Sequence, residues 1–318
     1  MLLIIARAVA CASLVALAAC NGGAATPPPF GTGAAAFTIT AGGSMNMEAM
    51  QTLRFYPAAL TIDAGDTVTW TFPSGEPHTV TLLGPKPALP PPTDPANPVP
   101  AGGSTYDGTV YTSSGFQLLG KSYSVTFTTP GTYTFACLLH GGMKGTITVQ
   151  PAGTPYPGSN FAAAAGASAA QSADLALGPP ALAQFPYPPG GPHLVAGMAP
   201  GLAMGMPSAV TIMRFLDGPD LNATSVTMHA GDTVTWTNQS NNAPHTITLA
   251  PVGAPFPNLP FLSPPAGGNV YDGSTLVHSG LLPPGKSFAV QFTKPGTYTY
   301  HCILHDDTEN MIGTVVVL

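Results

Sequence analysis

Charged residues are scarce in this sequence. Lysine and arginine together number 8, aspartate and glutamate 14, and all four make up only 7% of the 318 residues. With a formal net charge of -6 and no basic stripe, the composition argues against a nucleic-acid partner. Hydrophobic residues reach 44%, which excludes a solvated disordered polymer. At this length the chain is expected to bury two separate cores.

Helical signals are also scarce, because no amphipathic helix stands out and long helices are not expected beyond the N-terminus. Glycine and proline each number 37, which favours an all-β scaffold with long loops. Short runs of Thr, Val, Tyr and Phe alternate along the chain and are separated by Gly, Pro and Asp. The fold class predicted is two tandem Greek-key β-sandwiches. Two proline-rich inserts, 84–100 and 251–265, are expected to be surface loops.

Only four cysteines are present, and two of them lie near the N-terminus. Residues 1–20 combine one cation with a short apolar run, as expected of a secretory signal rather than a membrane span. The run ends in Leu-Ala-Ala-Cys20 and resembles the lipobox of bacterial lipoproteins, which implies lipidation of Cys20 after cleavage. An ordinary signal peptide with a chance cysteine is the alternative. Residues 21–36 are then a flexible tether, and the protein is expected to be extracytoplasmic and membrane-anchored, on the periplasmic or cell-surface side.

The other two cysteines, Cys137 and Cys302, sit in matching local sequences. A disulfide between Cys137 and Cys302 is one interpretation. The same role for each cysteine in its own domain explains their matching local sequences better. The halves repeat in order: 64–70 matches 230–236, 77–82 matches 244–249, 106–108 matches 271–273, 130–134 matches 295–299, and 143–146 matches 311–314. The predicted domains are 37–150 and 205–318. An Ala, Gly and Pro-rich linker over 151–204 joins them.

Each repeat carries the same four metal-binding residue types in the same order. A Pro-His pair comes first, a cysteine follows a strand of aromatic residues, a histidine stands three residues after the cysteine, and a methionine closes the motif. A thiolate with two imidazoles and a weak thioether suits both oxidation states of copper. Zinc is less well matched, since the paired Cys-x-x-Cys or His-x-x-x-His spacing of structural zinc sites does not occur. The candidate ligands are His78, Cys137, His140 and Met143, and His245, Cys302, His305 and Met311.

This signature resembles that of the cupredoxins, the blue-copper proteins of the plastocyanin and amicyanin type. The resemblance covers both repeats and implies two cupredoxin-like domains, each with one type 1 copper ion. It departs from the family where Thr79 and Thr246 stand in place of the usual asparagine after the first histidine. A threonine hydroxyl can replace part of that hydrogen bonding. The loop from His305 to Met311 is also longer than its counterpart, although Met311 has the same Met-x-Gly-Thr context as Met143.

The resemblance implies electron transfer, with His140 and His305 near the surface as exits for the electron. The expected partner is a redox protein such as a cytochrome or an oxidoreductase. Acidic residues follow His305 at 306, 307 and 309, so domain 2 alone is predicted to dock a basic partner.

Two other functions stay open. A copper oxidase or nitrite-reductase-like enzyme needs more ligands. His301 adjoins Cys302 and points to the opposite face, but no His-x-His pair occurs, and the scattered histidines at 193, 229 and 278 are more typical of surfaces or turns. Copper storage is the third function, suggested by methionines at 45, 47, 50, 198, 204 and 206, although gap-filling in apolar packing or a place in a mobile segment is the preferred explanation of these residues.

Overall fold

The computed structural model describes residues 34–185, 187, 193–198, 210–217, 219–221, 224–240 and 243–318. The expected signal peptide with Cys20, the tether up to residue 33, Met204 and Met206 lie outside the described residues. Within the described part of the chain, no helix combines the length and apolar character needed to cross a membrane.

The strands form where apolar and polar residues alternate. In β4 (Thr67–Thr71) the side chains of Val68 and Trp70 are fully buried, whereas the three threonines that alternate with them are partly exposed. The equivalent strand β14 (Thr233–Gln239) buries Val234 and Trp236 in the same way. Because alternate side chains of a strand point to opposite faces, each of these strands covers a core with one face only.

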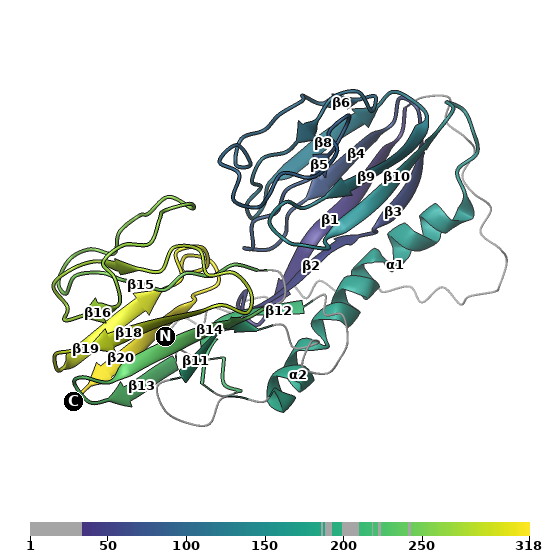
Figure 1. Ribbon diagram of the computed structural model, residues 1–318. Helices are drawn as coiled ribbons and strands as arrows, with labels where there is room; N and C mark the ends of the chain where they lie inside the picture. The colour runs from purple at the N-terminus through teal and green to yellow at the C-terminus, as the bar shows by residue number, and fades with distance from the viewer. Residues whose placement is uncertain are drawn as a thin grey trace, which may run out of the picture. The chain divides into compact units, whose positions relative to one another are not determined.

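The N-terminal repeat is a sandwich of two sheets, with strand orders β2-β1-β4-β8-β6 and β3-β10-β9-β5-β7 (Figure 1). The pairs β1 with β4, β3 with β10 and β6 with β8 are parallel, and the other neighbours are antiparallel. The predicted β-sandwich is confirmed. The remaining strands are β1 (Ala36–Met45), β2 (Met50–Tyr56), β3 (Ala59–Asp63), β5 (Thr81–Leu82), β6 (Thr105–Tyr106), β7 (Thr112–Ser113), β8 (Ser122–Phe127), β9 (Gly131–Ala136) and β10 (Lys144–Gln150).

The C-terminal repeat has the same strand order, β12-β11-β14-β18-β16 in one sheet and β13-β20-β19-β15-β17 in the other (Figure 1). Each sandwich encloses its own cluster of buried apolar side chains. The duplication predicted from the amino-acid sequence is therefore also present in the structure. The strands are β11 (His193–Met198), β12 (Val210–Leu216), β13 (Thr224–Met228), β15 (Thr248–Leu249), β16 (Val270–Tyr271), β17 (Val277–His278), β18 (Ser287–Phe292), β19 (Gly296–His301) and β20 (Ile312–Val317).

The edge strands β2 and β12 pair with each other and join one sheet of each domain. Their antiparallel register sets Val210 opposite Thr52 and Ile212 opposite Met50. The result is a single ten-stranded sheet whose order, read from the centre outward, is the same in both halves. The linkage between the domains is thus a backbone hydrogen-bond ladder in addition to the covalent connection.

The stretch 151–204, expected to be a linker without secondary structure, contains two helices, α1 (Gly158–Leu175) and α2 (Gly178–Gln184). Helix α1 packs against β1, β2 and β3. Helix α1 forms because alanine has a high intrinsic helix propensity. It docks onto the sheet through polar groups and has no apolar stripe, which is the sequence pattern by which a packed helix is usually predicted. The amide of Asn160 bonds both backbone groups of Thr61.

The boundary expected at residue 204 is also corrected, because β11 lies before it. This strand pairs with β12 and β14 and buries Leu194 in the core of the second domain. The second sandwich therefore takes its equivalent of β1 from the stretch that composition assigned to a linker. A run of six residues is too short to stand out among glycines and prolines by periodicity alone.

Candidate metal centre

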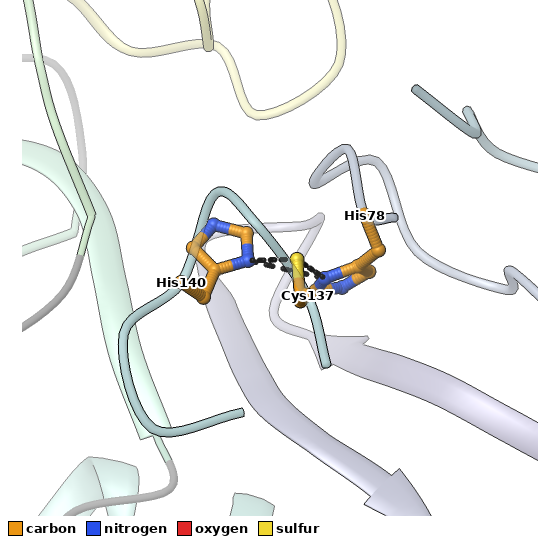
Figure 2. A group of neighbouring side chains, drawn as sticks. All are labelled: His78, Cys137 and His140. Carbon is orange, nitrogen blue, oxygen red and sulfur yellow. Dashed lines mark hydrogen bonds between the residues drawn. The ribbon is translucent and has the colours of Figure 1, made fainter. Parts of the chain in front are cut away.

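In the first domain, His78, Cys137 and His140 converge at one end of the sandwich. The sulfur of Cys137 lies 3.9 Å from Nδ1 of His78 and 3.5 Å from Nδ1 of His140, and the two nitrogens are 3.2 Å apart. Figure 2 shows both imidazoles turned toward the sulfur. All three side chains are buried, with at most 4% exposure. The structure thus brings together three of the four predicted residues by their donor atoms.

Three separate segments supply these side chains. His78 exchanges two backbone hydrogen bonds with Gln117, at 3.1 and 2.8 Å, which fixes it just before β5. Cys137 directly follows β9 and belongs to the apolar core, so its thiol is held at the rim of the sandwich. His140 lies in the turn between β9 and β10.

The second domain repeats this geometry. The sulfur of Cys302 lies 3.8 Å from Nδ1 of His245 and 3.2 Å from Nδ1 of His305, and the two nitrogens are 3.1 Å apart. Burial is as complete, with no side chain of the three above 1% exposure. Among the described residues, these two triads are the clusters of His, Cys, Asp and Glu arranged to hold a metal ion.

The donor set and its spacing fit copper. A metal ion at about 2.0–2.3 Å from three donors in one plane keeps those donors roughly 3.5–4 Å apart. The sulfur-to-nitrogen distances of 3.5 and 3.9 Å in the first domain lie in this range, and the nitrogen pair at 3.2 Å is slightly closer. A trigonal set of two imidazoles and one thiolate with room for a weak axial ligand is typical of blue-copper sites.

Electrostatics favour the thiolate form of Cys137. Burial alone raises the pKa of this thiol, but the charge of His140 and hydrogen bonds with His140 and His78 bring the pKa well below its usual value. Burial lowers the pKa of His140, but the other contributions, chiefly the charge of Cys137, raise it overall to about 9. The thiolate, which is the form of cysteine that binds metal, is therefore the favoured form of Cys137.

Backbone contacts place the two methionines next to the cysteines. The amide of Cys137 donates to the carbonyl of Met143 at 2.9 Å, and the amide of Cys302 donates to the carbonyl of Met311 at 3.1 Å. Both methionine side chains are buried, at 2% and 0% exposure. The longer second loop therefore closes on its cysteine in the same way as the short one. Axial ligation by Met143 and Met311 stays a prediction.

The two threonines that depart from the family pattern do hold the ligand loops together. The hydroxyl of Thr79 accepts a hydrogen bond from the amide of Leu138 at 2.7 Å, and Thr246 accepts one from Ile303 at 2.9 Å. The amide of Thr79 also points at the sulfur of Cys137, 3.4 Å away. Threonine thus supplies the link between the first histidine and the cysteine loop that the sequence led us to expect.

Glu76 is a site residue that the sequence analysis missed. Nε2 of His140 donates to Oε1 of Glu76 at 2.7 Å, and Nε2 of His305 lies 3.0 Å from Oε2. Burial raises the pKa of this carboxyl, but His305 and His140 hold it well below its usual range. A signal for it existed in the sequence, since the matched Pro-His pairs are preceded by Glu76 in one repeat and by Ala243 in the other.

The contact with Glu76 corrects the expectation that His140 and His305 open to the surface. Their exposures are 0% and 1%. Of the acidic residues that follow His305, Glu309 is fully buried and Asp306 pairs with Nδ1 of His301 at 3.0 Å, whereas Asp307 is exposed, so docking of a basic partner by the second domain stays a prediction. The Nε2 edges of His140 and His305, which were expected to face an external partner, instead face the carboxylate of Glu76.

The remaining histidines take separate places. His301 stacks on Phe256, with 3.7 Å between the ring centroids. His229 is exposed, as expected, and so is His193 in β11, but His278 is buried and bonds to Thr248, which differs from the expected surface position. None of these four belongs to a metal-binding cluster of the described residues.

The methionines proposed for copper storage do not share one environment. Met50 is a core residue packed with Leu182 and Val195, whereas Met47 is 85% exposed and Met45 is partly buried at the edge of the same cluster. Met198 ends β11. For Met50 the packing interpretation is therefore the correct one.

The family model described as "Copper binding proteins, plastocyanin/azurin family" matches this chain twice, over residues 42–150 and 220–318. Plastocyanin of Scenedesmus fuscus is 37% identical over 100 residues, which cover 31% of this chain and 88% of that protein. Chloroplastic plastocyanin of Physcomitrium patens is 36% identical over 100 residues, covering 31% of this chain and 51% of that protein. A solved oxidised amicyanin variant, 23% identical, covers 36% of this chain and 82% of its own, with a TM-score of 0.25.

Proposed function

Since this chain belongs to the plastocyanin/azurin family of copper-binding proteins, we propose that it is an electron-transfer protein with one type 1 copper ion in each of two cupredoxin domains. The observation that carries the proposal is the pair of His-Cys-His triads, which repeat the same donor atoms at nearly the same spacing. The axial positions belong to Met143 and Met311. Copper supplies a one-electron change between its two common oxidation states.

The protein's own contribution is to keep the donors in place during that change. The ligand side chains are buried, and they are anchored by backbone bonds at His78 and by the link from Thr79 to Leu138. A donor set that cannot move lowers the rearrangement that accompanies gain or loss of an electron. This rigidity supports a carrier, not an enzyme, because electron transfer requires no substrate position at the metal.

Absorption and paramagnetic resonance spectra of the Cu(II)-loaded protein, together with metal counting, test this function. We expect an intense visible band, the narrow copper hyperfine splitting of blue sites, and two copper ions per chain. Cys137→Ser and Cys302→Ser are each expected to remove half of the band, and the double variant all of it. A colourless wild-type protein, or colour that survives the double substitution, contradicts the proposal. A third copper ion instead supports an oxidase.

We further propose that the protein works outside the cytoplasm, tethered by lipid on Cys20. The support is the sequence of residues 1–20 alone. Membrane fractionation of cells that express the full chain provides the test. The wild type is expected in the membrane fraction and Cys20→Ser in the soluble extracytoplasmic fraction. Equal partitioning of the two forms argues against the anchor.

The partner proposed is another redox protein, such as a cytochrome or an oxidoreductase. Copper whose ligands are all buried gains and loses electrons without exchanging ligands. A second electron carrier must therefore supply these electrons and take them away. Stopped-flow mixing of the reduced copper protein with an oxidised cytochrome is expected to show matched loss and gain of the two chromophores. No reaction with any soluble cytochrome or oxidoreductase of the same compartment rejects this partner class.

A further inference from the structure

We infer that Glu76 is a positioning residue shared by both copper sites: one carboxylate of the first domain orients a ligand imidazole in each domain. This inference rests on the proposed function. Its geometric basis is one carboxylate whose two oxygens face two imidazoles: Oε1 lies 2.7 Å from His140 and Oε2 lies 3.0 Å from His305.

The contact determines which nitrogen of each imidazole is free to bind metal. A neutral imidazole carries its proton on one nitrogen, and an acceptor beside Nε2 keeps the proton there. In the neutral ring, which is the form that binds metal, the lone pair is then on Nδ1, the atom that faces Cys137 in one domain and Cys302 in the other, at 3.5 and 3.2 Å. Carboxylates that orient a ligand histidine in this way raise metal affinity.

The arrangement is asymmetric, because one domain supplies the carboxylate for both. Glu76 stands two residues before His78, and the equivalent position in the second repeat is Ala243, whose carbonyl accepts hydrogen bonds from Asn238 and Ser240. His305 therefore depends on the first domain for its contact at Nε2. The carboxylate is 3% exposed, so water does not screen it.

The shared contact also provides a short route between the sites. It leads from one ligand imidazole through a single carboxylate to the other ligand imidazole. Copper held at both triads would therefore be linked through a ligand of each site, and one electron could pass between them with no bond made or broken and no proton moved.

Substitutions at Glu76 separate this role from a local one. Glu76→Ala removes both acceptor oxygens, and Glu76→Gln leaves one acceptor and one donor, so it can serve only one imidazole. Copper affinity is measured at the second site alone in a Cys137→Ser background, and at the first site alone in a Cys302→Ser background. We expect Glu76→Ala to weaken both sites by about 10–100-fold and Glu76→Gln to weaken chiefly one.

Glu48→Gln is the matched control, because Glu48 bonds the amide of Gly75 in the same loop and contacts neither histidine in the structure. It is expected to leave both affinities unchanged. A loss confined to the first site in Glu76→Ala means that Glu76 only supports its own loop, and this overturns the inference. Unchanged affinity at both sites overturns it as well. Circular dichroism checks that each variant is folded.

A measurement on the metal-free protein keeps this test independent of the proposed function. Long-range proton–nitrogen spectra of histidine report the protonation of each ring nitrogen. We expect protons on Nε2 of His140 and His305 in the wild type, and a changed pattern for both rings in Glu76→Ala. Identical spectra contradict the shared contact even if both sites turn blue with copper. A colourless protein with the expected spectra instead rejects only the copper function.

Discussion

The backbone of Gly42 lies directly against the imidazole of His78. A Cβ added at Gly42 would fall 2.3 Å from Nε2, and the residue has a φ of +73°, which favours glycine. Gly197 has the same relationship to His245, at 1.9 Å and a φ of +68°. Each first histidine ligand is therefore backed by a glycine of the strand beside it, in β1 and in β11.

Gly42→Ala is expected to displace His78 and weaken the first copper site. The added methyl group clashes with a ring that has no space to retreat within a packed interior. We expect loss of most of the blue band of domain 1, measured in a Cys302→Ser background, and a lower melting temperature. Gly65→Ala is the control, since Gly65 has a φ of +104° but open space around its Cβ position. It carries only the backbone penalty of about 1–2 kcal/mol. Equal copper affinity in both variants contradicts the packing argument.

The sequence predicted what each repeat encodes locally. Cys137 and His140 lie three residues apart, so their proximity is set by one turn, and the matched flanks identified His78 as their partner. The alternation of Val68 and Trp70 with threonines likewise predicted a strand with one buried face.

The features that the sequence analysis missed arise between distant segments. Gly197 contacts His245 because β11 pairs with β14, a register that nothing in the glycine-rich stretch before residue 205 specifies. Glu76 acquires its role only through its contact with His305 in the other repeat. Helix α1 was missed because Asn160 and Gln171, which are polar, dock it onto the sheet. Periodicity of apolar residues does not report such contacts.

Removal of the Thr79 hydroxyl is expected to destabilise the first site even without metal. Thr79→Val keeps the shape but leaves the buried amide of Leu138 without its acceptor, which costs about 1–3 kcal/mol. Thr79→Ser retains the hydroxyl and is expected to stay close to the wild type. Chemical denaturation of the metal-free proteins measures the difference. If valine and serine variants unfold at the same denaturant concentration, this hydrogen bond does not support the loop.

Stability at acid pH is expected to depend on Glu48. Burial opposes its ionisation, but hydrogen bonds from the amide of Gly75 and from Ser44 and Gln51 lower the pKa of Glu48 overall below 4.5. A carboxyl whose folded pKa is below the unfolded value adds stability above the unfolded pKa, and this contribution is lost as pH falls through the folded pKa. The wild type should therefore exceed Glu48→Gln in free energy of unfolding at pH 7, and the gap should narrow below about pH 4.5. A gap that is constant from pH 7 to pH 3 contradicts this assignment.

The axial role of the methionines is tested by Met143→Leu and Met311→Leu. Leucine fills a similar buried volume, so the metal-free protein is expected to lose less than about 1.5 kcal/mol of stability. Loss of an axial thioether, in contrast, changes the reduction potential of the copper that it contacts. Each substitution is studied with the other site disabled by its Cys→Ser change, so that one potential is measured at a time.

Met50→Leu is the control, because Met50 is equally buried but packs with Leu182 and Val195 away from both triads. We expect the potential and the visible band to move for Met143 and Met311 and to stay fixed for Met50. A fixed potential in Met311→Leu shows that the longer loop, although it closes on Cys302 through its backbone, does not deliver its sulfur to the metal.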